Sequence, residues 1–305
     1  MSPTVSFNLI REYWAPFPWG TEASGITNTC NFDSFLAHII FLHRHDPTYF
    51  ARVLNHVNSV PEHTIRRIVA LYSARVPNAV YLSTQSHFMW RSMLMLDTSQ
   101  QARFLGTQRG SGRAGVINMA STMDVTVFQP LSDSSLLWFV HSCSCRESVD
   151  PASRFPLVYA EEIQKVVDGV FDSDKSKKKC KQCQTTFNSR HRPFVAQTTW
   201  FIHFPIGNPQ TFSHLTLLSD IPEIITLPEL RTGNEIDFQL GFISYTHYHA
   251  NLRVPYGHTT SVHLIGRNFY EYDGMERGGD LRPLEEGEEP HAAGREARYA
   301  VYFRL

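Results

Sequence analysis

The chain has 305 residues, with 28 Lys and Arg against 29 Asp and Glu, and a formal net charge of -1 at pH 7. This length allows a large core, in one domain with insertions or in two domains. The balanced charge gives no reason to expect a nucleic-acid partner, and no stretch reaches the roughly 18 consecutive apolar residues of a membrane span. Residues 1–20 lack the basic tip and apolar run of a signal peptide, so we expect an intracellular protein, cytoplasmic or nuclear.

The stretch 24–29 is small and polar, and Cys30 directly follows it at the start of an apolar pattern with helical period. A cysteine attacks as the thiolate, which the positive end of a helix dipole stabilises. We therefore interpret Cys30 as a nucleophile at a helix N-terminus. The alternative is a small buried core cysteine, and only partners elsewhere in the chain can decide against it.

The first half of the chain after this cysteine is helical in character. The pattern predicts a helix after Cys30, one around 47–57 and one from 61 to about 75. Residues 79–96 are compatible with a further helix but have poor periodicity, and the glycines within 98–116 indicate a loop. The N-terminal residues 1–23 show no pattern that predicts a helix or a strand.

The second half changes from helical to strand character. Short runs rich in β-branched and aromatic residues predict strands, separated by Pro, Gly and Asn. These runs are 136–140, 199–204, 215–218, 236–245, 261–265, 268–272 and 299–304. A helix is expected at 160–170, and the acidic run 285–289 is most simply an exposed loop. The fold class is therefore α+β, with the helices concentrated first.

Four of the five cysteines form two close pairs, Cys143 with Cys145 and Cys180 with Cys183. In an intracellular chain, two close pairs favour a structural Zn²⁺ bound by four thiolates over a disulfide framework. Redox chemistry or unrelated thiols are the alternatives. The lysine-rich run 175–181 is a solvated loop that also offsets the negative charge of such a site; it lacks the interleaved aromatics of a nucleic-acid surface.

A predicted β-hairpin at 257–273 supplies partners for the remaining cysteine. His258 starts one strand and Asp273 ends the other, so the two side chains are expected side by side at the open end. A thiol nucleophile needs an imidazole to take its proton and an acceptor to orient that imidazole. Cys30, His258 and Asp273 fit these roles, divided between an early helix and a late hairpin as in papain-like enzymes. His263 is the competing base, but it lies nearer the turn, where we expect it opposite 267–268.

These motifs resemble those of the ubiquitin-specific proteases. Residues 27–34 are similar to the cysteine box of that family, and 257–273 matches its histidine box in spacing. The two cysteine pairs stand where the family has the zinc ligands of its fingers, and 297–303 resembles its last strand. The resemblance thus spans residue 24 to the end of the chain, and the chain is identified as a divergent member of this family.

The resemblance implies a papain-like fold with a helical thumb (about 24–130), zinc-bearing fingers (136–200) and a β-rich palm (200–305) in one catalytic domain, 24–305. It also implies a thiol-dependent deubiquitinase, which hydrolyses the isopeptide bond after the C-terminal glycine of ubiquitin or a ubiquitin-like modifier. The alternatives are a weak or inactive member that binds ubiquitin or SUMO, and a SUMO-specific isopeptidase. A zinc-stabilised scaffold or nucleic-acid module is a third reading.

Two departures from the family pattern concern single positions. The family usually has an Asn five residues before its nucleophile, as a donor to the oxyanion, and here that position is Gly25. Loss of one such donor costs roughly two to three orders of magnitude in rate. Either Asn28 or the backbone N–H of Cys30 replaces it, or the enzyme is weak. The first cysteine pair is also C-x-C instead of C-x-x-C.

Overall fold

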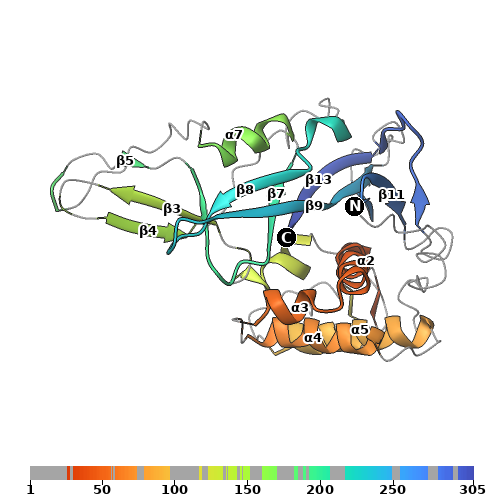
Figure 1. Ribbon diagram of the computed structural model, residues 1–305. Coiled ribbons are helices and arrows are strands. Elements are labelled where there is room, and N and C mark those ends of the chain that lie inside the picture. Colours follow the sequence, from red (N-terminus) through yellow and green to blue (C-terminus); the bar gives the residue numbers. More distant parts are fainter. Residues whose placement is uncertain are drawn as a thin grey trace. The chain divides into compact units, whose positions relative to one another are not determined.

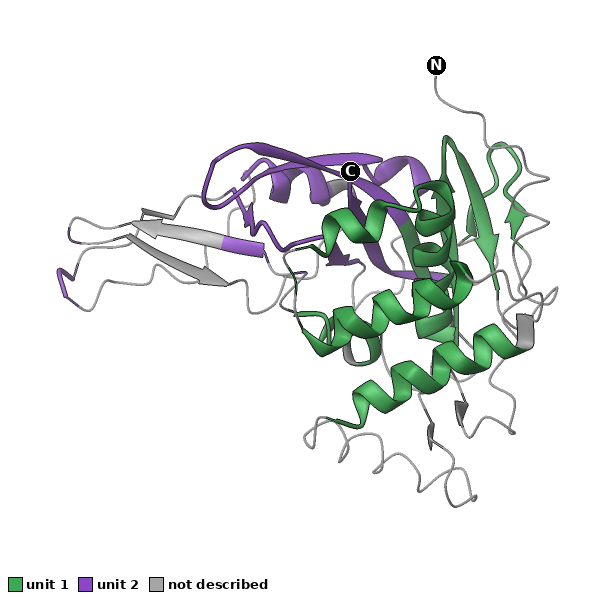
Figure 2. Ribbon diagram, turned by 60° about the horizontal axis from the view of Figure 1, so that its bottom comes forward, with its two compact units in different colours: residues 1–132, 242–295 green, residues 133–241, 296–305 purple. Residues whose placement is uncertain are grey.

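The computed structural model describes most of the chain after residue 25. The described residues are 26–27, 30–55, 57, 59–73, 79–96, 117–118, 123–132, 135, 137–142, 145, 147–151, 160–169, 182–184, 188–189, 192–206, 217–248, 255–273, 281–290 and 295–305. The chain divides into two compact units: unit 1 is Met1–Ser132 with Phe242–Arg295, and unit 2 is Asp133–Gly241 with Glu296–Leu305 (Figure 2). The predicted division into thumb, fingers and palm has three parts with other boundaries, and it stays a prediction.

Unit 1 begins with helices, as the sequence predicts. They are α2 (Cys30–His45), α3 (Tyr49–Val53), α4 (Val60–Ser73) and α5 (Ala79–Leu94). Helix α3 begins later than expected because the Asp46 carboxylate accepts hydrogen bonds from the backbone N–H and hydroxyl of Thr48, at 2.9 and 2.6 Å. This turn holds the chain out of the helix until Tyr49.

Helices α4 and α5 lie side by side (Figure 1). Helix α5 forms although its hydrophobic period is poor, and its buried face explains why. That face mixes polar with apolar side chains; the buried residues include Leu82, Ser83, Ser86, His87, Trp90, Met93 and Leu94. Because several inward positions are polar, a hydrophobic pattern alone underestimates this helix.

The larger group of strands in unit 1 is antiparallel. Strand β10 (Pro255–Ile265) pairs with β11 (Asn268–Tyr272) on one side and with the second half of β9 (Glu235–Tyr248) on the other. β11 continues to β12 (Arg282–Pro283). The β10–β11 turn has Gly266 at φ +66°, a conformation that glycine adopts without strain. The predicted hairpin is therefore confirmed, with its turn at 266–267.

Three small elements complete unit 1. β1 (Ile26–Thr27) and β2 (Ile117–Asn118) form a parallel pair. The π-helix η3 (Asp124–Phe128) packs against α2, and the indole N–H of Trp90 donates to its Thr126 carbonyl at 2.9 Å. These contacts tie the start of α2 to the rest of the helical layer.

Unit 2 is mainly antiparallel strands. One group is built around β3 (Leu137–Ser142). Three strands pair with it: β4 (Glu147–Pro151), β5 (Asn188–Ser189) and β6 (Phe194–Val195). The other group holds β7 (Phe201–Pro205), β8 (Ile224–Pro228), the first half of β9 and β13 (Arg295–Arg304), of which 296–304 belongs to this unit. The short helices η5 (Ala160–Glu162) and α7 (Ile163–Val167) cover the predicted helix at 160–170.

One strand prediction is wrong where it can be checked. Leu218, expected in a strand at 215–218, starts the 3-10 helix η6 (Leu218–Asp220). The Asp220 carboxylate accepts a hydrogen bond from the Leu217 N–H at 3.2 Å, which closes this turn. Among the described residues, no helix combines the length and apolar character needed to cross a bilayer. The structure is mixed helix and sheet, as the α+β prediction has it.

Candidate functional site

Helix α2 begins at Cys30 and places this residue at the positive end of the helix dipole. The apolar residues that follow it are fully buried, which anchors the helix; they include Phe32, Phe35, Leu36 and Ile39. Cys30 itself is 4% exposed, and its carbonyl accepts a hydrogen bond from the Ser34 hydroxyl at 3.0 Å. The backbone N–H groups of a first helical turn point toward the helix start, where they can donate to an anionic group.

His258 lies in an irregular part of β10. Pro255 pairs with Tyr248 and Thr259 pairs with Thr246, so four steps along β10 match two along β9. Such a bulge changes the direction of the side chains within it, and bulges of this kind are common beside active sites. The irregularity includes His258, whose imidazole is almost completely buried.

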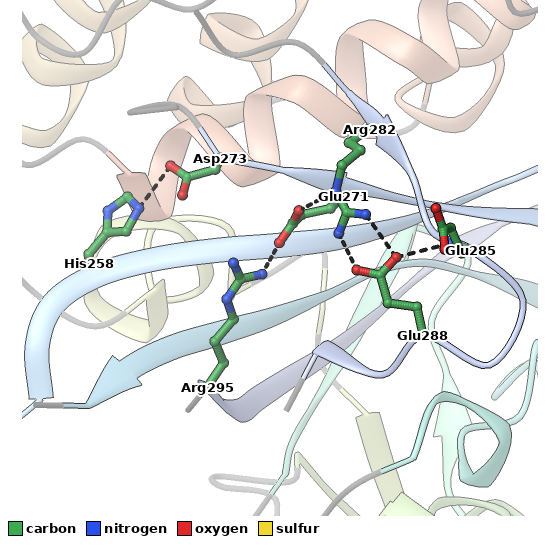
Figure 3. A network of polar contacts seen from close by, with 7 residues as sticks. All are labelled: His258, Glu271, Asp273, Arg282, Glu285, Glu288 and Arg295. Carbon is green, nitrogen blue, oxygen red and sulfur yellow. Dashed lines mark hydrogen bonds and ion pairs between the residues drawn. The ribbon is translucent and has the colours of Figure 1, made fainter. Parts of the chain in front are cut away.

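Asp273 meets this imidazole from the end of β11. The Oδ1 atom of Asp273 accepts a hydrogen bond from Nε2 of His258 at 2.9 Å (Figure 3). The carboxylate is buried, so the imidazole ring is held by a negative charge that water screens little. This contact fixes the ring's orientation and leaves Nδ1 as the second nitrogen for proton transfer.

The protonation of His258 reflects both neighbours. Burial alone lowers the pKa of its imidazole, but hydrogen bonds with Asp273 and Cys30, together with their negative charges, raise it from 6.5 to about 9. A thiol whose proton passes to such an imidazole becomes a thiolate beside an imidazolium. The structure thus brings Cys30, His258 and Asp273 together within unit 1.

Glu271 is a buried carboxylate two residues before Asp273 on β11. Its oxygens accept hydrogen bonds from Arg282 Nε at 2.9 Å and from Arg295, and Arg282 Nη1 also donates to Glu288 at 2.8 Å (Figure 3). The predicted exposed acidic loop is therefore only partly exposed, because Glu288 pairs with this arginine. The network neutralises Glu271 and holds β11 in place.

A second carboxylate–imidazole contact joins α2 to α5. Asp33, one turn after Cys30, hydrogen-bonds His87, and both side chains are 1% exposed. Beside this contact, Phe32 stacks on Trp90 with ring centroids 5.0 Å apart. Sequence reasoning did not find this contact; the only available signal was the polar character of inward positions on α5.

Tyr272 lies close enough to several acidic groups to interact with their charges. Burial raises the pKa of its phenol well above the ordinary value, and the charges of Asp33, Tyr72, Asp273 and Cys30 raise it further. Tyr272 is therefore a neutral hydroxyl beside the site. The sequence pattern predicts only that Tyr272 belongs to a strand.

His263, the competing base, does not approach Asp273. It pairs across the hairpin with Tyr270, and not with 267–268 as expected, because the turn is tight enough for Ile265 to pair with Asn268. Its imidazole contacts His38 of α2 and Ser261 instead. The choice between the two histidines, made from strand register, agrees with these contacts.

The two positions linked to the oxyanion, Gly25 and Asn28, lie outside the described residues. Their predicted roles stay predictions. Cys30 is described and begins the helix, so its backbone N–H remains a candidate donor to an oxyanion.

Two of the four predicted zinc ligands are described, and both are in unit 2. Cys145 lies in the turn between β3 and β4, and its Sγ donates to the Oε1 of Gln182 at 3.8 Å, one residue before Cys183. Pairing of β3 with β5 brings these two segments together, because Ser142 lies opposite Asn188. Soft thiolates from two adjoining segments suit Zn²⁺. Cys143 and Cys180 lie outside the described residues, and within the described part of the chain no cluster of three or more metal-binding side chains occurs.

No family model and no curated protein matches the chain. Among solved structures, the deubiquitinase module of yeast SAGA matches at 12% identity, over 100% of this chain and 71% of that chain, with a TM-score of 0.44. The PAN2 pseudoubiquitin-hydrolase of Saccharomyces cerevisiae matches at 9% identity, over 97% and 91%, with a TM-score of 0.46. The Saccharomyces cerevisiae Pan2 module of pseudoubiquitin hydrolase and RNA exonuclease matches at 9% identity, over 100% and 57%, with a TM-score of 0.49. At these identities and TM-scores, the site residues themselves have to carry a functional conclusion.

Proposed function

We propose that this chain is a cysteine isopeptidase of the ubiquitin-specific protease type, which cleaves after the C-terminal glycine of ubiquitin or a ubiquitin-like modifier. One observation carries the proposal: His258 hydrogen-bonds Asp273 and interacts electrostatically with Cys30, and Cys30 begins a helix. A merely buried cysteine needs none of these features. The sequence motifs around both halves of the site agree with this chemistry.

Each residue has a defined task in the reaction. His258 takes the thiol proton, and the Cys30 thiolate attacks the carbonyl carbon of the terminal glycine. His258 then gives the proton to the leaving lysine amine as the thioester forms. Water activated by His258 hydrolyses the thioester, while Asp273 keeps the ring oriented and stabilises the imidazolium.

The oxyanion of each tetrahedral intermediate needs donors. The backbone N–H of Cys30 at the helix start provides one, and we propose the Asn28 side chain as a second, in place of the Asn that Gly25 lacks. Removing one oxyanion donor lowers kcat by roughly 100- to 1000-fold. Asn28→Ala should therefore lose activity in this range, and an unchanged rate would exclude Asn28 from the oxyanion site.

The direct test uses ubiquitin and SUMO that carry an electrophile at the C-terminus. We expect one of these probes to form a covalent adduct with wild-type protein, located at Cys30 by mass spectrometry, and no adduct with Cys30→Ala. The site of the adduct is the control for nucleophile identity, because the other four cysteines are present in the same sample. Failure of wild-type protein to react with either probe would contradict the proposal.

The main alternative is a module that binds ubiquitin or SUMO without cleaving it. The glycine at position 25 favours it, because a family donor is missing there. Binding of an unmodified modifier without turnover, and with no covalent adduct, would support this alternative. Reaction with the SUMO probe alone would instead indicate a SUMO-specific isopeptidase.

We further propose that the two cysteine pairs bind one structural Zn²⁺ in finger-like strands, within a papain-like arrangement of thumb, palm and fingers. The contact between Cys145 and Gln182 supports the pairing of the two segments. Bound zinc would supply a four-thiolate crosslink and no catalytic chemistry. Metal analysis should find one zinc per chain, lost in both Cys145→Ser and Cys183→Ser; retention of zinc in both variants would contradict the site.

A further inference from the structure

A pair of imidazoles lies in the core of unit 1, away from the Cys30 site. Nδ1 of His38, on α2, is 3.3 Å from Nδ1 of His263, on β10, and the two rings stack with centroids 5.5 Å apart. Both side chains are buried, at 2% and 0% exposure. Buried polar groups in proteins are nearly always hydrogen-bonded, and here each imidazole is the partner of the other.

Both rings are neutral. Burial lowers the pKa of His263 to about 3, and burial together with the charge of His263 lowers the pKa of His38 well below its ordinary value. One Nδ1–H therefore donates to the lone pair of the other Nδ1. Nε2 of His263 is 2.8 Å from the Ser261 hydroxyl, which can either donate or accept and so fits both tautomers.

The surrounding side chains are aromatic. Phe242 lies 5.8 Å from His38 and 5.4 Å from His263 between ring centroids, and Tyr272 meets the edge of His263 at 5.8 Å. Phe41 packs on His38 at 5.8 Å. Aromatic rings at these distances shield the Nδ1–Nδ1 bond from water.

The pair joins the same two elements that carry the reactive groups. Cys30 is the first residue of α2 and His38 follows it by eight residues, or roughly 12 Å of helix. His258 and His263 both belong to β10, five residues apart and thus separated by roughly 16 Å of strand. Two polar interactions of the described residues thus join the helix to the strand, in addition to the packing between them: the Cys30–His258 interaction and the imidazole pair.

We propose that His38 and His263 are positioning residues, whose Nδ1–Nδ1 hydrogen bond fixes α2 against β10 and so holds Cys30 within hydrogen-bonding reach of His258. This inference rests on the proposed function, because it gives the imidazole pair a role in that site. Apolar packing alone allows a helix to slide along a sheet, whereas a buried hydrogen bond fixes both distance and direction. Loss of the bond would let the start of α2 shift relative to His258.

Three variants separate positioning from simple support of the core. The double change His38→Phe with His263→Phe removes this bond together with the Ser261–His263 bond but keeps two rings, and replacing both imidazoles avoids leaving one of them unsatisfied. His38→Asn keeps an amide nitrogen near the place of Nδ1 and should preserve the bond. His203→Phe changes a histidine of β7 in unit 2 and is the matched control.

The readout is the alkylation rate of Cys30 by iodoacetamide near pH 6, measured on the Cys30 peptide by mass spectrometry, together with the NMR titration of His258. Because a displacement of about 1 Å can lower a rate about 100-fold, we expect the double Phe variant to lose at least about tenfold in alkylation rate. The pKa of His258 should fall from about 9 in that variant, since it loses the Cys30 hydrogen bond. We expect His38→Asn and His203→Phe to stay within about threefold of wild type, a difference too small to indicate a lost contact.

A folded double Phe variant with unchanged alkylation and unchanged His258 titration would overturn the inference. An unfolded double variant leaves the decision to His38→Asn and His38→Leu: equal alkylation in these two, when both are folded, would equally overturn it. The readout needs no modifier, so it separates this inference from the proposed function. If neither ubiquitin nor SUMO reacts while alkylation depends on the pair, the positioning role stands and the proposed substrate falls.

Discussion

The two histidines of β10 stand five residues apart and have opposite protonation behaviour. His258 contacts Asp273 and Cys30, and its pKa rises to about 9; His263 contacts the neutral His38 and Ser261, and its pKa falls to about 3. Burial favours the neutral ring in both cases. The difference shows that the Asp273 and Cys30 partners outweigh burial at His258, whereas burial keeps His263 neutral.

The contrast matches a division of tasks along one strand. An imidazole that exchanges a proton with a thiol needs a carboxylate, which stabilises its charged form. An imidazole that holds two elements together needs a constant protonation state, and a neutral partner in an aromatic shell provides one. Four predictions test the imidazoles and the carboxylates of these strands.

The largest effect is expected from Asp273→Asn, which removes the charge that distinguishes His258 from His263. We expect kcat to fall roughly 10³- to 10⁴-fold, because the ring loses both its stabilised charge and its fixed orientation. Steady-state hydrolysis of a fluorogenic ubiquitin or SUMO substrate measures it. Asp33→Asn is the matched control, since Asp33 is also a buried carboxylate bonded to a histidine. A loss of equal size in both variants would show that the effect is general destabilisation.

A second prediction concerns the other carboxylate of β11. Arg295→Met leaves the buried Glu271 with one arginine partner, so we expect the free energy of unfolding to fall by roughly 2–4 kcal/mol. Urea denaturation measures this change. Arg52→Met, in an exposed ion pair with Asp46, should change it by less than about 1 kcal/mol. If both changes were equally small, the Glu271 network would not be supporting β11.

A third prediction concerns stability in acid. The folded-state pKa of His38 and His263 lies below the unfolded value of 6.5, so the unfolded chain binds more protons as the pH falls below about 6.5. Their contribution to stability is complete above this pH. We expect a loss of roughly 1–3 kcal/mol between about pH 7 and pH 5, which is absent from the double Phe variant. Urea midpoints at the two pH values measure it, and an identical acid loss in the variant would contradict it.

The fourth and smallest effect lies on the alkaline side. The folded-state pKa of His258 is raised above 6.5, so its contribution to stability is complete below about 6.5 and is lost as the pH rises through about 9. We expect this loss, on the order of 1 kcal/mol by about pH 9, in wild type and not in Asp273→Asn. The same urea series extended to alkaline pH measures it. Alkaline loss of equal size in both proteins would assign it to other groups.

Much of the fold follows from the sequence because hydrophobic period and turn residues act locally. The helix after Cys30 and the hairpin around Gly266 have such local signals, and both are confirmed. The apolar neighbours of Leu218 predict a strand, whereas in the structure the Asp220 carboxylate two residues later closes a helical turn. The late start of α3 has a similar cause, because the Asp46 carboxylate binds the backbone N–H of Thr48.

The site was partly predictable for a different reason. His258 and Asp273 belong to one hairpin, so strand register brings them near each other, and the irregularity of β10 around His258 completes the contact. The partners of His38, Asp33 and Glu271 lie far away in the sequence, and no periodic pattern shows that two polar residues will meet in a core. A long-range contact such as the one between the two imidazoles of unit 1 depends on packing, which only the structure reveals.

The measurement that tests the central claim most directly is a residue-resolved NMR titration of His258 and His263 in one sample, repeated after Cys30→Ala. We expect His258 to titrate near 9 and His263 to remain neutral down to about 3. In Cys30→Ala, the pKa of His258 should fall while His263 is unchanged. A His258 pKa near 6.5 that does not respond to loss of Cys30 would contradict the thiol–imidazole pair, and with it the proposed isopeptidase.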